Sequence, residues 1–167
     1  ITDNPLKIKG LQSKPFDGEG LATKKTNIVE NGVLKTWFLD LSTANQLNLL
    51  STGHASRGIS SPPSPNPTNL YFEPGKITRK NLIGNIKKGI YLTELMGSSV
   101  NLINGDYSRG GSGFWIDKGE ITYPINEITI ADNLNDIFKK IIVADDLEFK
   151  QGLNSPTMLI DNMTVAG

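Results

Sequence analysis

Apolar and polar residues alternate along much of the chain, which is the pattern of half-buried β-strands. The segment KKTNIVENGVLKTWFLD alternates on both sides of Asn31-Gly32, a dipeptide that accepts the positive φ angles of a type I′ turn. We predict a hairpin there. Further strands are predicted over IYLTELM, VNLINGDYS, GGSGFWID and EITYPI, with a glycine turn at DKGE, and then over EITIAD and the closing TMLIDNMTVAG.

Two short segments carry helical signals instead. Ser42 or Thr43 can cap a helix over ANQLNLLS that ends at Gly53. Thr78 can cap a second helix over TRKNLIGNIKKG, which the pattern ends at Gly89. Both helices are predicted to be short, because a glycine follows each apolar run closely.

A third helix is predicted over LNDIFKKIIVA, capped by Asp132 or Asn133. Its apolar residues fall at helical spacing and form one continuous stripe: Leu134, Ile137, Phe138, Ile141 and Ile142.

The predicted strands outnumber the helices and connect by hairpins more often than by crossovers. The fold class predicted is therefore mainly β (α+β), an antiparallel twisted sheet or open barrel with two or three short helices packed on it. The segment SSPPSPNPT carries four prolines in nine residues, which predicts a surface loop over about residues 55–69 without ladder or helix.

Composition narrows the function classes. The 167 residues suit one domain, and the 17 basic and 17 acidic residues give no bulk field that would attract nucleic acid or anionic lipid. The absence of cysteine excludes disulfides, a zinc ribbon and a cysteine protease, and it fits a reducing cytosol. No apolar run is long enough to predict a membrane span. The opening ITDNPLKIKG leads us to expect a piece of a longer protein.

Single residues give only weak evidence for a catalytic or metal-binding site. His54, the one histidine, is predicted to be an exposed loop residue, and a single imidazole cannot assemble a zinc site. Ser108 with His54 as base lacks both a nucleophile elbow and an evident orienting acid. Glu94 either is buried with a raised pKa or points to solvent. The adjacent Asp145 and Asp146 are expected to face water.

The stretch GDYSRGGSGFW supports two interpretations. Its glycines would let backbone N–H groups approach an anion, with Arg109 offering a bidentate fork, although the GK[ST] ending of a P-loop is missing. In the other interpretation, the glycines let two backbones pass closely, while Phe114 and Trp115 alternate inward and outward. The residues alone leave both interpretations open.

Several blocks resemble the C-terminal part of the PmbA/TldD family, the so-called modulators of DNA gyrase. They are SKPFDGEGLATKKTNIVENGVL, LYFEPG, GIYLTELMG, VNLINGDYSRGGSGFWIDKGEITYPINEITIADNL and MLIDNMTVAG. The runs DYSRG, GFWI and YP-EITIA resemble the PmbA branch, also called TldE. The resemblance implies that residues 1–167 are the C-terminal β-rich domain of a longer cytosolic protein, roughly its last third.

The resemblance also implies a function. The TldD branch is a zinc metallopeptidase whose HExxxH helix lies upstream and whose cysteine ligand lies near the C-terminus, whereas this chain reads DDLEFKQGLNSPTM there. The resemblance therefore implies that this domain has no metal ligands or catalytic residues of its own. It implies a subunit that helps to assemble the complex and to enclose peptide substrate. The implied partner is a TldD-like subunit, which would hold the zinc, or a second copy in a homodimer; no nucleic-acid or membrane partner is expected.

Five residues are the candidates for lining the shared cavity: Asp106, Tyr107, Ser108, Arg109 and Gly110. Two alternatives remain. One is an autonomous zinc metallopeptidase with its metal site upstream, and the other is a regulator of DNA gyrase, which the family's historic name suggests.

Overall fold

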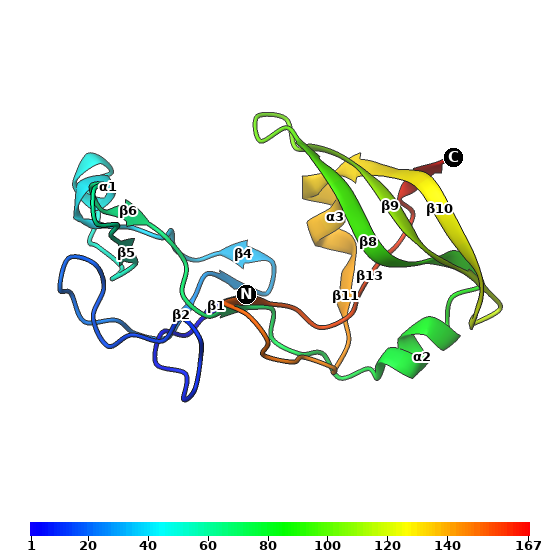
Figure 1. Ribbon diagram of the computed structural model, residues 1–167, viewed down its shortest axis with the longest axis horizontal. Helices are drawn as coiled ribbons and strands as arrows, with labels where there is room; N and C mark the ends of the chain where they lie inside the picture. Colours follow the sequence, from blue (N-terminus) through cyan, green and yellow to red (C-terminus); the bar gives the residue numbers. More distant parts are fainter. The chain divides into compact units, whose positions relative to one another are not determined.

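The computed structural model describes residues 1–167, except for the side chain of Ser98 (Figure 1). The chain divides into two compact units. Unit 1 comprises Ile1–Glu73 and Leu147–Pro156, and unit 2 comprises Pro74–Asp146 and Thr157–Gly167. The assignment of residues 1–167 to one domain stays a prediction. The two units are compact parts of this chain.

Unit 1 is built from very short strands. Its main sheet is four-stranded, with one parallel pair between the first two strands of the order and antiparallel pairs elsewhere. The order across the sheet is β12 (Leu153–Asn154), β7 (Leu70–Tyr71), β1 (Thr2–Asp3) and β2 (Thr26–Asn27). Its buried apolar residues are Ile28, Leu39, Ala44, Ala55 and Tyr71.

The predicted hairpin at Asn31-Gly32 is confirmed. Strands β3 (Val29–Glu30) and β4 (Val33–Leu34) pair in antiparallel register. Asn31 has φ 50° and Gly32 has φ 77°, so both turn residues occupy the left-handed region that a type I′ turn requires.

Helix α1 (Leu41–Gln46) begins and ends earlier than predicted. Its cap is Asp40 rather than Ser42 or Thr43, because the Asp40 carboxylate accepts the Thr43 N–H at 2.7 Å while Thr43 Oγ1 accepts the Asp40 N–H. Hydrogen bonds from the Thr43 side chain and backbone hold the pKa of Asp40 below its usual value. The helix stops well before Gly53, since Asn48 already takes φ 54°.

The proline-rich segment contains a ladder that was not predicted. Strand β5 (Ala55–Ser56) pairs with β6 (Ser64–Pro65). Proline is tolerated because each strand of a two-stranded sheet has one free edge, where no N–H is needed. Residues 57–62 between these strands are exposed, as expected for a surface loop.

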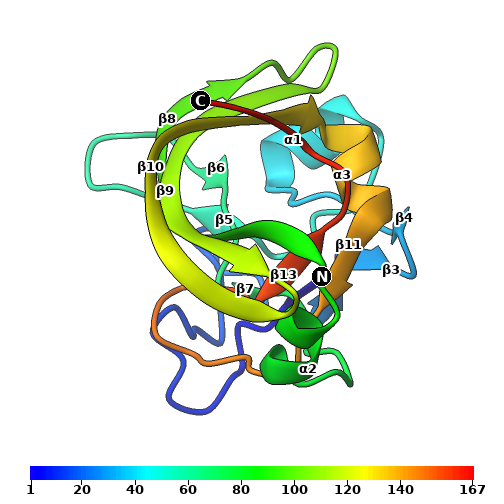
Figure 2. The same cartoon turned by 90° about the vertical axis from the view of Figure 1, so that its right-hand side faces the viewer.

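Unit 2 contains an antiparallel sheet of long strands that curves around helix α3 (Figure 2). Its order is β14 (Thr164–Ala166), β10 (Glu120–Asn133), β9 (Asp106–Asp117) and β8 (Lys88–Val100). The sheet is open, and no closed barrel forms in the part of the chain that the structure describes. The prediction of a mainly β fold with three short helices is confirmed.

The strand boundaries in unit 2 differ from the predicted ones. VNLINGDYS is not a strand, because residues 101–105 form the turn between β8 and β9. EITYPI and EITIAD belong to the single strand β10, in which a bulge with Glu127 at φ 57° separates them. The predicted turn at DKGE is confirmed, with Lys118 and Gly119 at positive φ.

Helix α2 (Arg79–Gly84) has the predicted cap, since Thr78 Oγ1 accepts the Asn81 N–H at 3.2 Å. It does not reach Gly89. The chain beyond the helix is held by the β9–β10 turn, where Lys118 and Gly119 donate their N–H groups to the carbonyls of Lys87 and Ile86, both at 2.8 Å. This contact diverts the chain into β8.

Helix α3 (Leu134–Lys140) is capped by Asn133, as predicted, but it is shorter than predicted. Residues 141–143 leave the helix and form β11 (Ile141–Val143), paired with β13 (Met158–Ile160). Three consecutive β-branched residues favour a strand once a partner strand is present. The closing segment is accordingly two strands, β13 and β14, instead of the single one predicted. Among the helix stripe, Ile137 is buried and Phe138 is exposed.

No helix in the structure is both long and apolar enough to cross a lipid bilayer.

Candidate functional site

The five candidate residues lie on β9, the strand between β8 and β10. Side chains alternate along a strand, so Tyr107 and Arg109 lie on one face of the sheet. Asp106, Ser108 and Gly110 lie on the other face. The five residues therefore cannot all contact one ligand. A ligand on either face of the sheet would contact only the residues on that face.

The face that carries Arg109 is the one that faces helix α3. Arg109 pairs with Ile130 and Tyr107 pairs with Asp132, and residues paired across an antiparallel ladder share a face. Ile130 is buried, and the carboxylate of Asp132 lies 3.0 Å from Nζ of Lys140 in the last turn of α3. Hydrogen bonding from the Asn133 N–H, and then Lys140, lowers the pKa of Asp132. The side of the sheet that faces α3 is its concave side (Figure 2), so the pairing places Tyr107 and Arg109 on that side.

Arg109 has a donor that is not used within the chain. Its Nη2 donates to the carbonyl of Leu95 at 3.2 Å, whereas its Nε is buried and has no hydrogen-bond partner among the described atoms. A buried donor without a partner is costly, and a guanidinium can hold a carboxylate or carbonyl through two N–H groups at once. Arg109 could therefore donate a hydrogen bond to an additional oxygen atom without breaking its existing contact.

The glycines of β9 serve different purposes. A Cβ added at Gly113 would collide with the carbonyl oxygen of Tyr91. One at Gly111 would lie 3.0 Å from Cδ2 of Leu92, whereas one at Gly110 would find its nearest neighbour at 3.7 Å. The interpretation that glycine allows two backbones to pass closely is therefore confirmed at Gly113, and crowding does not require glycine at Gly110.

The four register shifts of this sheet lie in β8 and β10, the two neighbours of β9, while β9 advances regularly. Bulges increase the local twist and bend of a strand. They explain how β8 and β10 curve along the regular strand β9. Phe114 and Trp115 follow on opposite faces: Phe114 is 37% exposed, and Trp115 stacks on Tyr123 with the ring centroids 6.4 Å apart.

Two other carboxylates lie as expected. Glu94 is exposed, which fits the alternative that it points to solvent, and Asp145 is exposed. The expectation that Asp146 also faces water is not met: it is half-buried, because its carboxylate accepts the N–H and Oγ1–H of Thr157 at 2.8 and 2.7 Å. Burial alone would raise the pKa of Asp146, but the hydrogen bonds from Thr157 outweigh burial and lower it.

The prediction that His54 is exposed is wrong. Its side chain is 1% exposed, and its ring lies 4.9 Å from the ring of Phe38. Nε2 is 3.2 Å from the carboxylate of the fully buried Asp3, and Nδ1 is 2.8 Å from Oγ1 of Thr52. An orienting acid therefore exists. It lies 51 residues away in the sequence, where no local pattern could reveal it.

The pair His54 and Asp3 does not fit a zinc ion. Both ring nitrogens are engaged, and the Asp3 carboxylate also accepts the N–H and the Oγ1–H of Thr68 at 2.8 and 2.5 Å. A zinc site needs at least three free protein ligands. Over the described residues, no group of three or more His, Cys, Asp or Glu side chains could hold a metal. Ser108, the other member of the hydrolase-like pair, belongs to unit 2, whereas His54 belongs to unit 1.

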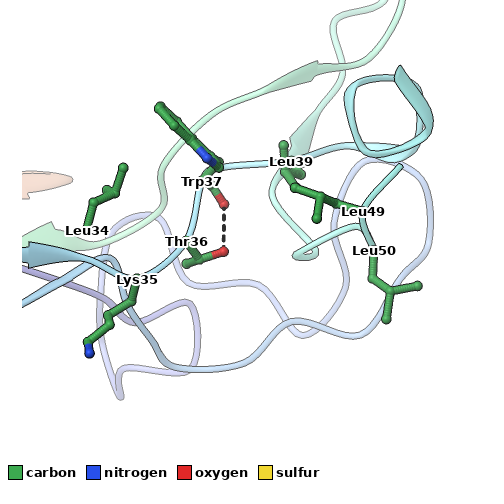
Figure 3. A pocket seen from close by; sticks show the side chains of 7 residues that line it. All are labelled: Leu34, Lys35, Thr36, Trp37, Leu39, Leu49 and Leu50. Atoms are coloured by element: carbon green, nitrogen blue, oxygen red, sulfur yellow. Dashed lines mark hydrogen bonds between the residues drawn. The ribbon is translucent and has the colours of Figure 1, made fainter. Parts of the chain in front are cut away.

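Unit 1 also has a hollow of about 290 Å³ beside β4 (Figure 3). Its lining combines apolar side chains with the polar side chains of Lys35 and Thr36. Both polar side chains are already engaged, since Thr36 Oγ1 donates to the Trp37 carbonyl at 3.4 Å and Nζ of Lys35 lies 3.8 Å from the Glu30 carboxylate. The lining residues are Leu34, Lys35, Thr36, Trp37, Leu39, Leu49 and Leu50.

A second hollow of about 330 Å³ in unit 1 is more polar. Lys14, its cation, already donates to the carbonyl of Ala55 at 3.1 Å. The lining residues are Gln12, Lys14, Ser56, Asn66, Pro67, Thr68, Gln151, Gly152 and Leu153.

Comparison with known proteins defines the class to which this fold belongs. The family model described as PmbA/TldA metallopeptidase C-terminal domain matches residues 1–167. The chain therefore belongs to this family, and the resemblance inferred from its sequence blocks is confirmed.

Particular relatives cover the whole chain. It is 39% identical to the metalloprotease PmbA of Escherichia coli O157:H7, covering 100% of this chain and 35% of that protein. The PmbA homolog of Haemophilus influenzae is 40% identical, with 100% and 36% covered. A TldD homolog of Buchnera aphidicola is 29% identical, with 93% and 36% covered. The chain thus spans about a third of the length of these curated relatives.

Solved structures agree with this assignment. A Thermotoga maritima protein described as a modulator of a DNA gyrase matches with a TM-score of 0.87 and 34% identity, over 99% of this chain and 38% of that one. TldE from Thermococcus kodakarensis matches with a TM-score of 0.88 and 26% identity, over 99% and 39%.

Proposed function

We propose that this chain is the C-terminal domain of a PmbA-type (TldE-type) subunit of a cytoplasmic metallopeptidase complex that acts on unfolded peptides. In this role it assembles the complex and encloses substrate, and it supplies no catalytic group. The observation that carries the proposal is the difference in sequence identity between two groups of relatives. Identity is 39–41% over the whole chain for PmbA proteins and 29% for TldD homologs.

Two features of the chain support a role without metal ligands. The resemblance to TldD implies a cysteine ligand in the C-terminal region, and this chain contains no cysteine. His54 is engaged through both of its nitrogens in a buried contact with Asp3 and Thr52. We therefore place zinc in a TldD-like partner, with a homodimer as the other arrangement.

Within unit 2, we propose that Arg109 contacts the peptide substrate, with Tyr107 beside it on the concave face. The buried Nε without a partner supports this choice, because it offers a donor to a peptide carbonyl or a terminal carboxylate. Asp106, Ser108 and Gly110 lie on the opposite face, so in this proposal they contribute to the backbone of the strand rather than to the same contact.

The first experiment measures cleavage of an unfolded polypeptide by the full-length protein, alone and mixed with a TldD-type partner. Activity only in the mixture is the expected result. Activity of the protein alone that a chelator abolishes would replace the proposal with the autonomous zinc peptidase, whose metal site would lie upstream.

The second experiment replaces Arg109 with alanine in that mixture. Loss of a hydrogen bond from a charged group should raise KM about tenfold, while assembly measured by light scattering stays intact. Arg57, which is exposed, provides the matched control, since Arg57→Ala should change neither quantity. Unchanged peptide cleavage by Arg109→Ala would overturn the substrate contact.

Regulation of DNA gyrase is the second candidate function. The description of the Thermotoga maritima relative favours it, and the balanced charge of this chain points to contact with the enzyme rather than with DNA. A gyrase supercoiling assay with the purified full-length protein distinguishes it from the peptidase role.

A further inference from the structure

Three positions in the sequence place aspartate or asparagine directly before glycine. They are Asp17-Gly18, Asn31-Gly32 and Asn104-Gly105. Glycine leaves its own backbone nitrogen unhindered, so that this nitrogen can attack the preceding side-chain carbonyl carbon. The reaction needs a mobile side chain and an N–H group that is not held elsewhere. These two conditions differ sharply among the three positions.

Asn31 satisfies both conditions. Asn31 and Gly32 are exposed at the tip of the β3–β4 hairpin. In the described structure, no hydrogen bond reaches the Asn31 side chain or the Gly32 N–H. The flanking strands are only two residues long, so little else fixes the turn.

Asn104 is just as exposed but is restrained at every reacting group. Its Nδ2 donates to the Asp106 carboxylate at 2.7 Å, and its Oδ1 accepts the Asp106 N–H at 3.1 Å. The attacking nitrogen, that of Gly105, donates to the carbonyl of Asn101 at 2.8 Å. Exposure therefore does not separate Asn31 from Asn104, but hydrogen bonding does.

Asp17 is restrained as well. Its side chain is buried and accepts the N–H groups of Glu19, Leu21 and Ala55 at 2.9, 2.9 and 3.1 Å. The N–H of Gly18 donates to the carbonyl of Ala55 at 2.8 Å.

We propose that Asn31 is a site of spontaneous deamidation through a succinimide, and that hydrogen bonds protect Asn104 and Asp17 from forming that succinimide. The Gly32 nitrogen attacks Cγ of Asn31, a C–N bond forms and the Gly32 N–H proton passes to solvent. The side-chain amide nitrogen leaves as ammonia, which gives a five-membered succinimide. Water then opens the ring at either carbonyl and yields aspartate or isoaspartate, so that the modification consumes one water and releases one ammonia.

Either product changes the hairpin. A new carboxylate appears beside Glu30, whose own carboxylate is 3.8 Å from Nζ of Lys35. Isoaspartate also lengthens the backbone by one bond within a two-residue turn, which fixes the register of β3 and β4. Leu34 and Lys35, which follow this turn, line the hollow of unit 1 beside β4. The modification therefore alters one wall of that hollow.

The test ages the full-length protein in mildly alkaline buffer at physiological temperature and follows both Asn-Gly sites by peptide mapping and mass spectrometry. Isoaspartate is measured separately by enzymatic methylation. Three hydrogen bonds of ordinary net strength slow the reaction at Asn104 on the order of a hundredfold, so Asn31 should convert about that much faster.

The matched variant is Asp106→Ala, which removes the carboxylate that binds the Asn104 amide. It should accelerate conversion at Asn104 and leave the rate at Asn31 unchanged. Equal rates at the two sites in the unmodified protein, or an Asn31 that stays an amide while Asn104 converts, would overturn the proposal.

Discussion

At the scale of single residues, Asp3 connects segments of unit 1 that lie far apart in the sequence. It is fully buried in the first strand and accepts two hydrogen bonds from Thr68, while Nε2 of His54 faces it at 3.2 Å. Because a carboxylate only accepts, the Nε2 atom carries the hydrogen in this contact. The polar cluster fixes β1 against the chain around residues 52–54 and 68.

Replacement of Asp3 by alanine should therefore be strongly destabilising. It leaves three buried donors without an acceptor, which we expect to lower the free energy of unfolding of the full-length protein by about 2–5 kcal/mol. Urea titration followed by fluorescence measures this change. Asp145→Ala, at an exposed carboxylate, is the control and should stay within about 0.5 kcal/mol. A similar small change for Asp3→Ala would mean that this cluster does not hold unit 1 together.

At the scale of elements, β9 owes its regular path to glycine at one particular position. The Gly113 backbone passes so close to the Tyr91 carbonyl that no side chain fits, whereas a Cβ at Gly110 on the same strand would find its nearest neighbour at 3.7 Å. The two positions form a matched pair, since the same substitution meets a neighbouring backbone in one case and ordinary contact distances in the other.

Gly113→Ala should destabilise the protein by roughly 1–3 kcal/mol, because β8 must move away from β9. Gly110→Ala should be neutral or slightly stabilising, since alanine restricts the unfolded chain more than glycine does. Thermal unfolding of both variants measures the difference. Equal losses of stability at the two positions would show that close backbone approach is not the reason for glycine at Gly113.

Short-range signals account for the elements that the sequence predicts correctly. The hairpin at Asn31-Gly32 and the caps Thr78 and Asn133 depend on residues within a few positions of one another, so the printed sequence contains them. The open antiparallel sheet follows in the same way from alternation and glycine turns. The capping box of Asp40 and Thr43 is equally local, because the acid lies only two residues before Ser42.

Long-range contacts account for the errors. Ile141–Val143 continues the helical stripe of α3, but pairing with Met158–Ile160 draws it into a strand. Gly89 is removed from α2 because the distant Lys118-Gly119 turn binds the preceding carbonyls. His54 is buried by a carboxylate from the first strand.

The candidate site stays a prediction. The sequence identified the GDYSRGGSG stretch and Arg109, and the structure adds that Arg109 has a buried Nε without a partner. Alternation along β9 separates the other candidates into two faces, which could not be assigned before the stretch was known to be one continuous strand.

At the scale of the whole molecule, the two units have very different strand lengths. Unit 2 contains three strands of 12 to 14 residues, and β9 is bonded on both sides. The strands of unit 1 have two residues each. Amide protection follows the number of hydrogen bonds that must open together, so the units should differ in local stability.

Hydrogen exchange of the full-length protein should therefore be slowest in β9, with amides of β1 and β7 exchanging at least roughly tenfold faster. Mass spectrometry of peptic peptides from Asp106–Asp117 and from Leu70–Tyr71 provides the comparison. Equal protection in the two peptides would indicate that unit 1 is stabilised by contacts beyond its own short ladders.

The discontinuous course of unit 1 also bears on the order of events at the ribosome. Strand β12 pairs with β7, but the two are separated in the chain by all of β8, β9 and β10. A ribosome synthesises the long hairpins of unit 2 before the last strand of the unit 1 sheet emerges. Hairpins close locally, whereas a distant parallel pairing must wait for its partner. The three long strands of unit 2 can therefore pair before unit 1 completes its main sheet, which stays one strand short until residues 153–154 leave the exit tunnel. The edge strand β14 (Thr164–Ala166) joins the unit 2 sheet last.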